Sequence, residues 1–107
     1  MSAAPLTDLD RLCVHTITTK SWDIETAAQK FSAAGVKGIT VWRDTYAGRD
    51  IAATGQMLRD HDLSIVSTCR GGFFPGATAA ERQTAIDDNR RAIAEAHELG
   101  APLVVLV

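Results

Sequence analysis

The chain has 107 residues, of which 46% are hydrophobic and 22% are charged, and its formal net charge is −2. Length and composition are typical of one globular domain, residues 1–107, and argue against intrinsic disorder. Basic and acidic side chains nearly balance, and no apolar run approaches the roughly 20 residues of a membrane helix. Neither nucleic acid nor a membrane is therefore expected as a partner.

The N-terminal segment has no basic region followed by an apolar stretch, so no secretory signal is expected and the cytoplasm is the predicted location. Cys13 and Cys69 could pair with each other. In a chain without a signal, however, they are expected to be reduced thiols.

Apolar, β-branched runs alternate with helical patterns along the chain. The first strand is expected at 12–16. Asp23 then caps a helix that Gly35 ends. A second strand at 38–42 leads through a polar segment into a helix that Asp50 caps and that ends near 61–62.

The third strand is expected at 63–68, with a loop over 69–76 after it. Thr78 and Glu81 have the spacing of a capping box, which predicts a helix that Gly100 ends. The final run, 103–107, is so apolar that a strand buried on both faces is expected.

Strand, helix and strand in this repetition predict parallel pairing through right-handed crossovers, an α/β fold with the order βαβαβαβ. Crossovers that all step in one direction would leave one apolar face of the sheet open, which a soluble monomer seldom tolerates. The chain also stops inside its most apolar strand. We therefore expect an N-terminal piece of a larger barrel, with a small doubly wound domain or a dimerising half-barrel as the alternatives.

Ligand sites of parallel α/β folds lie beyond the carboxyl ends of the strands. His15 is the histidine nearest such an end, where it could act as an acid, a base or a hydrogen-bond donor. The alternative is a satisfied core or rim histidine. His61 is expected to be exposed at a helix end, and His97 to be partly buried in a structural role.

Arg43 and Arg70 follow adjacent strands, and two converging guanidinium groups would clamp a carboxylate, a phosphate or a polarised carbonyl oxygen. Alternatively, each arginine pairs with an acid, and Asp44 is the obvious partner for Arg43. Trp42 beside Arg43 could be a platform for a sugar face, or it could pack at the rim.

The loop after the third strand carries weaker signals. Gly71 and Gly72 could bring backbone N–H groups close to an anion, although turn geometry alone would also explain them. Phe73 and Phe74 are expected to cover the mouth of the barrel. Cys69 has no obvious activating base, so a structural thiol is the preferred interpretation.

Several chemistries lack their sequence signatures. The chain has no dinucleotide-binding G-x-G-x-x-G, no phosphate-binding P-loop and no G-x-S-x-G nucleophile elbow. The four glutamates fall on predicted helices, and only Asp44 supplies a carboxylate near the strand ends. No metal site is therefore expected within this chain.

Several segments carry a family resemblance. VHTITTKSW at 14–22, AGV at 34–36 and GITVWRD at 38–44 resemble the opening of xylose isomerase-like TIM barrels. STCRGGFF at 67–74 and DDNRRAI at 87–93 are similar to a bacterial subgroup of sugar phosphate isomerases/epimerases. The likeness runs over nearly the whole chain, and the order and spacing of the segments specify the family better than any one of them.

This resemblance implies a (β/α)₈ TIM barrel of roughly 250 residues or more, of which the chain would be the N-terminal half or less. It also implies a divalent metal (Mn, Mg, Co or Zn), held by carboxylates and a histidine of later strands, and proton transfer through an enediolate. Those ligands and the catalytic groups would lie beyond Val107. His15, Trp42, Arg43 and Arg70 map onto the substrate side, and Asn89, on the Ile86/Ile93 face of its helix, is expected to make a buried hydrogen bond.

The leading hypothesis is the N-terminal portion of a cytoplasmic, metal-dependent isomerase or epimerase of a small sugar or sugar phosphate. On this hypothesis the 107-residue chain alone would be inactive, and a homo-oligomer is compatible with it. The second is a non-catalytic α/β module that binds an anion or a sugar, either as a monomer or as a half-barrel dimer. The third, an apurinic-site endonuclease of the same superfamily, is opposed by the net charge of −2.

Overall fold

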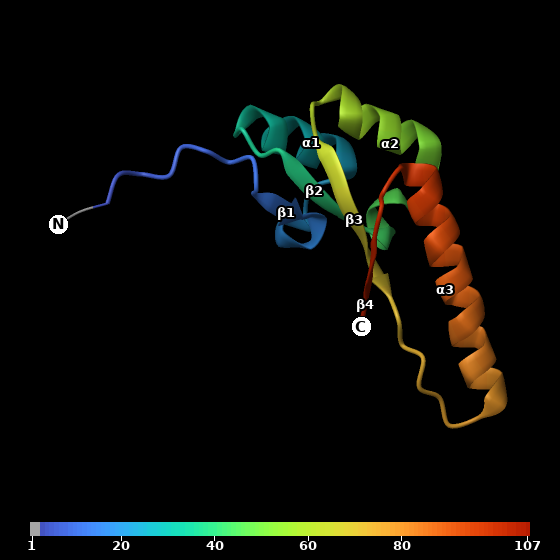
Figure 1. Ribbon diagram of the computed structural model, residues 1–107. Coiled ribbons are helices and arrows are strands. Elements are labelled where there is room, and N and C mark those ends of the chain that lie inside the picture. Colours follow the sequence, from blue (N-terminus) through green and yellow to red (C-terminus); the bar gives the residue numbers. More distant parts are fainter. Residues whose placement is uncertain (1–2) are drawn as a thin grey trace.

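The computed structural model describes residues 3–107, whose strands and helices alternate as the sequence predicts (Figure 1). The strands are β1 (Cys13–His15), β2 (Gly38–Trp42), β3 (Ser64–Gly71) and β4 (Val104–Leu106). The helices are α1 (Ile24–Ala33), α2 (Ile51–Asp60) and α3 (Ala79–Leu99). Two short 3-10 helices, η1 (Thr16–Thr19) and η2 (Arg43–Tyr46), follow β1 and β2 directly.

The four strands form one parallel sheet in the order β1-β2-β3-β4. His15 is level with Thr40, and Trp42 is level with Cys69, so the carboxyl ends of β1, β2 and β3 share one edge of the sheet. A doubly wound sheet would reverse its strand order at a switch point. The uninterrupted order is that of half a (β/α)₈ barrel and confirms the predicted fold class.

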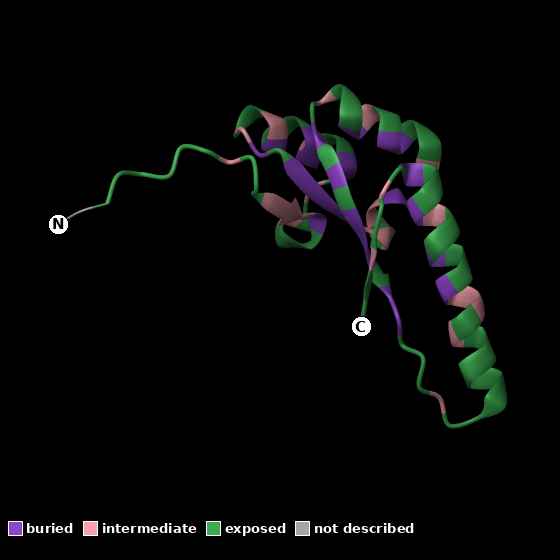
Figure 2. Ribbon diagram, in the orientation of Figure 1, coloured by how far each residue is buried: buried purple, intermediate pink, exposed green. Residues whose placement is uncertain are grey.

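All three helices cover the same face of the sheet (Figure 1). Ile39 and Val41 of β2 lie on this face and share one hydrophobic core with Phe31 of α1, Leu58 of α2 and Leu99 of α3. The buried residues accordingly concentrate between the sheet and the helices (Figure 2). The opposite face carries the alternate side chains of each strand, as the period of two requires.

The helices begin at the predicted caps. Asp23 accepts a hydrogen bond from the backbone N–H of Thr26, and Asp50 accepts one from Ala53. Thr78 and Glu81 form the capping box of α3. Each cap satisfies N–H groups that the first turn of a helix leaves without partners.

Several strand boundaries differ from the sequence prediction, and the carboxyl ends of β1 and β3 matter most for the site. β1 ends at His15 because Thr16 already belongs to η1. β3 continues to Gly71 instead of ending at Thr68, since Cys69 and Gly71 pair with β4. Cys69, Arg70 and Gly71 therefore lie in a strand, whereas a loop was expected there.

The expectation that the last strand is buried on both faces is wrong. Leu106 is 60% exposed and Val105 is 37% exposed. β4 is an edge strand of this sheet, paired with β3 on one side only. Strong hydrophobicity predicted burial, but only a second neighbour and a covering helix would produce it.

The buried face of α3 also differs from the predicted one. Ala92, Ala96 and Leu99 are buried, whereas Ile93 is 62% exposed. Small residues face the sheet because α3 crosses close to it and to α2. Ile93 instead lies beside β4, where little covers it.

The described chain is open in shape. Its radius of gyration is 16.0 Å, compared with about 13 Å for a compact chain of this length. The N-terminal segment extends away from the sheet and helices without secondary structure, which increases the radius of gyration (Figure 1). Among residues 3–107, no helix has the length and apolar character to cross a membrane.

Candidate functional site

Three side chains predicted from the sequence meet at the carboxyl edge of the sheet. His15 is the last residue of β1, Trp42 is the last residue of β2, and Arg70 is the penultimate residue of β3. Because β2 lies between β1 and β3, Trp42 is within reach of both neighbours. The parallel sheet thus brings together residues that are far apart in the sequence.

Trp42 contacts both of these neighbours. Its indole Nε1–H donates a hydrogen bond to Nδ1 of His15 at 3.1 Å. The guanidinium carbon of Arg70 lies 5.7 Å from the centre of the Trp42 ring and 4.5 Å from that of Phe73. These distances are those of cation–π contacts, so two aromatic rings hold the Arg70 side chain at the edge of the sheet.

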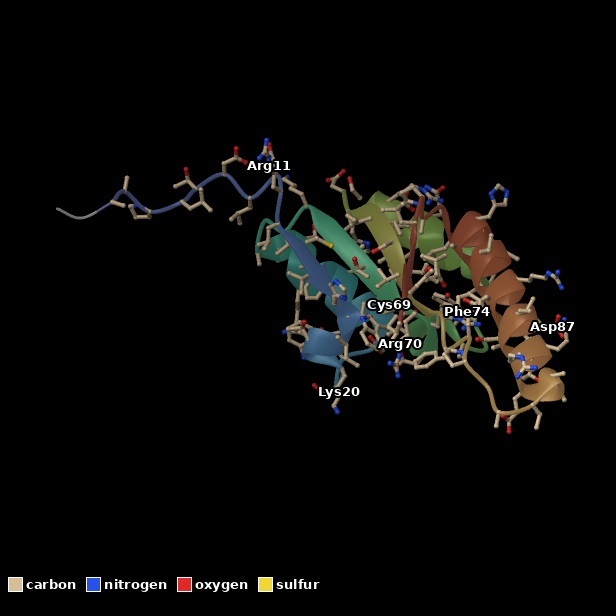
Figure 3. The ribbon with its side chains drawn as sticks, turned by 60° about the horizontal axis from the view of Figure 1, so that its bottom comes forward. Arg11, Lys20, Cys69, Arg70, Phe74 and Asp87 are labelled. Atoms are coloured by element: carbon tan, nitrogen blue, oxygen red, sulfur yellow. The ribbon has the colours of Figure 1, made fainter. Side chains whose placement is uncertain are left out.

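Arg70 is an exposed cation whose guanidinium makes no ion pair or hydrogen bond with any residue between 3 and 107. Figure 3 shows it at the end of β3, next to Cys69 in the chain. Its N–H groups are consequently free to donate to another molecule.

Arg43 instead binds two carboxylates of α3. Its Nε donates to Glu95 at 2.7 Å, and Nη1 and Nη2 donate to Asp88 at 3.0 and 3.1 Å. The alternative of an acidic partner is therefore correct in kind but wrong in identity, because Asp88 and Glu95 take the place of the neighbouring Asp44. The network ties η2 to α3 and compensates the charge of Arg43.

Tyr46 belongs to the same network. Its hydroxyl donates to Glu95 at 3.1 Å, and its ring is buried in the core. Burial raises the pKa of Tyr46, and the adjacent Glu95 carboxylate adds to this shift. The hydrogen bond from Arg43 lowers the pKa of Asp88. The phenol therefore stays neutral and the carboxylate stays ionised near neutral pH.

Asp88, Glu95 and Tyr46 were not among the site residues predicted from the sequence. Asp88 and Glu95 are seven residues apart on α3, a spacing that places both carboxylates on one face of a helix. That spacing is the signal that could have indicated a bridging cation. Which basic side chain bridges the two carboxylates depends on how α3 packs against η2.

A cleft of about 300 Å³ opens beside these residues. Arg43 and Arg70 both border it, as does Asp44, so the two arginines do reach one concave surface. His15 is not among its lining residues and reaches this surface only through Trp42. The lining residues are Ile17, Trp42, Arg43, Asp44, Cys69, Arg70, Phe73 and Asp88.

The glycine loop does not offer an anion site. The N–H of Gly72 donates to Oδ1 of Asn89 at 2.7 Å, and the N–H of Phe73 donates to the carbonyl of Val107. Nδ2 of Asn89 donates back to the carbonyl of Gly72 at 2.7 Å, which confirms the buried hydrogen bond predicted for Asn89. A Cβ on Gly72 would lie 2.1 Å from the Val107 oxygen, so close backbone approach explains this glycine.

The two cysteines are free thiols, and Cys69 is buried. Burial raises the pKa of Cys69, while Arg70 opposes this effect. A raised pKa disfavours the thiolate, so Cys69 fits the structural interpretation.

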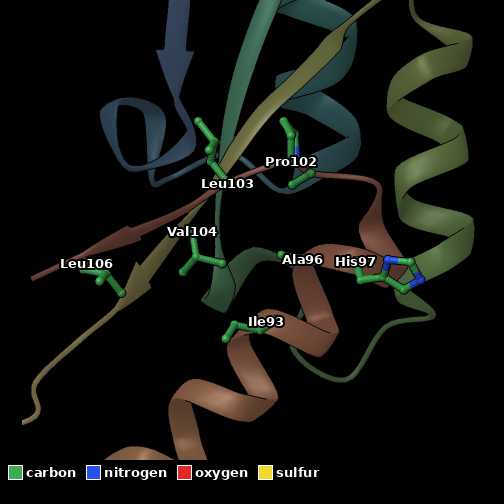
Figure 4. Close-up of a pocket in the computed structure, with 8 residues that line it drawn as sticks. Ile93, Ala96, His97, Pro102, Leu103, Val104 and Leu106 are labelled. Carbon is green, nitrogen blue, oxygen red and sulfur yellow. The ribbon is translucent and has the colours of Figure 1, made fainter.

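A second hollow, of about 580 Å³, lies between α3 and β4 (Figure 4). Ile93, Val104 and Leu106 line it, together with His97, which is exposed and not partly buried as predicted. The wall is mainly apolar and lies on the helix-covered face of the sheet, where a (β/α)₈ barrel packs its outer helices. It is therefore a packing surface and not a second polar site.

The described residues do not fit a metal site. No group of three His, Cys, Asp or Glu side chains between residues 3 and 107 lies close enough together to hold an ion. Of the two acids that line the cleft, Asp44 and Asp88, the second is bound to Arg43, which also binds Glu95. The divalent metal that the resemblance implies has no ligand set in this segment.

Comparison with known protein families identifies the family of this half-barrel. The model of the xylose isomerase-like TIM barrel matches residues 28–107. The chain belongs to this family. The family resemblance predicted from the sequence is thereby confirmed, and a search of curated proteins gives no match that would specify the activity further.

Solved structures agree with this family. A protein of Sinorhizobium meliloti 1021 is 38% identical, with a TM-score of 0.84 over 94% of this chain and 37% of its own. A xylose isomerase domain containing protein of Salmonella typhimurium LT2 is 15% identical, with a TM-score of 0.79 over 96% of this chain and 38% of its own.

A third structure, a xylose isomerase-like TIM barrel/4-hydroxyphenylpyruvate dioxygenase fusion protein, is 21% identical, with a TM-score of 0.78 over 88% of this chain and 15% of its own. The two less similar structures support the fold alone. The chain thus spans well under half the length of each of these proteins.

Proposed function

We propose that this chain forms the N-terminal wall of the substrate site in an isomerase or epimerase of small sugars or sugar phosphates. The observation that carries the proposal is the contact from His15 through Trp42 to Arg70, at the carboxyl edge of a half-barrel of this family. In barrels of this kind that edge is where substrates bind.

The proposed reaction moves a proton next to a sugar carbonyl through an enediolate. Such a reaction needs donors that hold and polarise the carbonyl and hydroxyl oxygens. Arg70 supplies an unpaired guanidinium, and His15 supplies a ring nitrogen on the other neighbouring strand of Trp42. Trp42 supports both. Arg43 borders the cleft as well. We propose that its guanidinium contacts the substrate at the rim of the cleft while it remains paired with Asp88 and Glu95.

The groups that remove and return the proton are not assigned within this chain. The free carboxylate beside the cleft is Asp44, since Asp88 is engaged by Arg43. The residues described here therefore bind and orient, and a metal with its carboxylate ligands is proposed to come from other strands of the complete barrel.

The test is Arg70→Ala in the complete enzyme. Loss of a guanidinium that holds a substrate oxygen should lower kcat/KM at least about tenfold, or about 1.4 kcal/mol of transition-state stabilisation. Arg90→Ala is the matched control, because Arg90 is exposed on α3 and makes only a 3.4 Å contact with Asp87. An unchanged kcat/KM in Arg70→Ala would contradict the assignment of this edge as the substrate wall.

A further inference from the structure

The hydrogen bond between Trp42 and His15 has a definite direction. An indole Nε1–H can only donate, so Nδ1 of His15 must be the acceptor at 3.1 Å. An accepting Nδ1 carries no proton. In the neutral ring the proton therefore resides on Nε2, which has no hydrogen-bond partner among residues 3–107.

Trp42 itself is firmly placed. Its backbone N–H donates to the hydroxyl of Thr16 at 2.9 Å, and its carbonyl accepts from the hydroxyl of Thr45 at 2.7 Å. Arg70 lies over its ring. Thr16 is buried and directly follows His15, so the same contact joins the ends of β1 and β2. The indole therefore meets His15 in one orientation.

We infer that Trp42 is a positioning residue that fixes His15 as a hydrogen-bond donor through Nε2, so that His15 donates to a substrate oxygen and does not act as the base. This inference rests on the proposed function for the identity of the acceptor. It deepens that function by assigning a role to each side chain at this edge.

The same geometry names the chemistry of the ligand. Arg70 is a donor without acceptor capacity, His15 presents an N–H, and the Trp42 N–H is already used. This edge therefore recognises acceptor atoms, such as the carbonyl and hydroxyl oxygens of an open-chain sugar. A proton cannot be abstracted by Nδ1, because the indole occupies it.

The hydrogen bond is tested by the indole N–H resonances of the ¹⁵N-labelled protein. The chain has two tryptophans, and Trp22, whose indole N–H has no acceptor between residues 3 and 107, is the internal control. Trp42→Phe and Trp22→Phe assign the two resonances. We expect the Trp42 N–H to resonate downfield of the Trp22 N–H and to exchange with solvent more slowly.

Variants of His15 then identify the acceptor. His15→Asn keeps an oxygen near the position of Nδ1 and should retain the downfield Trp42 resonance, whereas His15→Ala should lose it and leave Trp22 unchanged. If the native Trp42 resonance matches that of Trp22, or does not respond to His15→Ala, the inference is overturned. One folded variant, Trp22→Phe or Trp42→Phe, suffices to assign both native resonances, so their comparison stands even if a His15 variant fails to fold.

Activity of the complete enzyme tests the donor role separately. The amide nitrogen of a glutamine can reach the position of Nε2, whereas an asparagine whose oxygen accepts from Trp42 has no donor there, so His15→Gln should retain more kcat/KM than His15→Asn. Trp42→Phe should lower kcat/KM about fivefold to tenfold, the effect of one oriented hydrogen bond, with Trp22→Phe as the control. An equal or greater activity of His15→Asn would overturn donation through Nε2.

The resonance measurements test the positioning of His15, and the activity measurements test the proposed function, so failure of one can be told from failure of the other. If the resonances behave as expected but none of the His15, Trp42 and Arg70 variants changes kcat/KM, the positioning is correct and the proposed substrate wall is wrong. If Arg70→Ala alone lowers kcat/KM, the wall is correct and the role of His15 is wrong.

Discussion

At the scale of single residues, the two arginines show how one side-chain type acquires two tasks. Arg43 satisfies two carboxylates, whereas Arg70 rests between aromatic rings with its N–H groups free. The side chain of Arg43 is 24% exposed and that of Glu95 is 25% exposed, so this pair is shielded from water more than an ordinary surface ion pair. Substitution of Arg43 is therefore expected to lower stability, whereas substitution of Arg70 is expected to lower activity.

Arg43→Gln is expected to lower the free energy of unfolding by about 1–3 kcal/mol, because Asp88 and Glu95 lose a charged partner in a partly buried place. Urea denaturation, with Arg90→Gln as the exposed control, measures the difference. Equal stability of the two variants would show that the network contributes nothing.

The stability difference between the native protein and Arg43→Gln depends on pH. Arg43 lowers the pKa of Asp88 in the folded state, whereas an unfolded aspartate titrates near pH 3.9. Stabilisation from this pair is therefore present above that pH and is lost as the pH falls through the folded pKa. The difference between native protein and Arg43→Gln should shrink below about pH 4 and be constant between about pH 6 and 8.

The thiols provide a prediction with its own internal control. Cys69 is 4% exposed and its pKa is raised by burial, whereas Cys13 is half-buried. Iodoacetamide should therefore alkylate Cys13 before Cys69 in the native protein, as peptide mass spectrometry can follow. Faster alkylation of Cys69 would show that Arg70 governs its reactivity instead.

At the scale of elements, α3 is fixed by two close contacts. Asn89 binds the backbone of Gly72 at the end of β3, and the carbonyl of Leu99 lies against Gly55 of α2. Both contacts involve glycine backbones, which allow the approach of a side chain or a carbonyl that a Cβ would prevent.

Asn89→Ala should destabilise the protein by about 1–3 kcal/mol, because the N–H and carbonyl of Gly72 are left buried without partners. Gly72 precedes Phe73, which packs on Arg70, so a loss of enzyme activity should accompany the loss of stability. Denaturant unfolding beside the exposed control Arg90→Ala measures the first effect. Unchanged stability would contradict the role of Asn89.

Gly55→Ala is expected to destabilise this protein, although glycine-to-alanine substitutions in helices usually stabilise. In most helices this substitution stabilises by about 0.5–1 kcal/mol. Here the new Cβ would lie 2.1 Å from the Leu99 carbonyl oxygen, so α3 must shift and the melting temperature should fall. Thermal unfolding of Gly55→Ala measures this, and Ala52→Gly at an exposed position of α2 gives the ordinary helix effect. A raised melting temperature would contradict the close packing of α2 and α3.

At the scale of the whole molecule, β4 and the groove beside α3 expose apolar side chains. Ile93, Leu106 and Val107 are each about 60% exposed. Soluble proteins rarely leave such a patch in contact with water, and an unpaired edge strand adds free backbone donors and acceptors. In a (β/α)₈ barrel both would be covered by further strands and helices.

The 107-residue chain studied by itself should bind a hydrophobic dye and associate as its concentration rises. Sedimentation velocity measures the association, and Leu106→Lys should reduce it by placing a charge on the exposed edge. A dye-free monomer near 11.5 kDa at all concentrations would contradict this expectation.

The elements, their parallel pairing and the family follow from the amino-acid sequence, because caps, glycine stops and hydrophobic periods act over a few residues. The sequence also placed His15, Trp42 and Arg70 at strand ends. Which side chains contact one another depends on the packing of the whole fold, because these contacts join residues far apart in the chain. His15 and Trp42 are 27 positions apart, and Arg43 is 45 and 52 positions from its two carboxylates. The same holds for β4, whose composition indicates burial but whose exposure depends on which elements pack beside it.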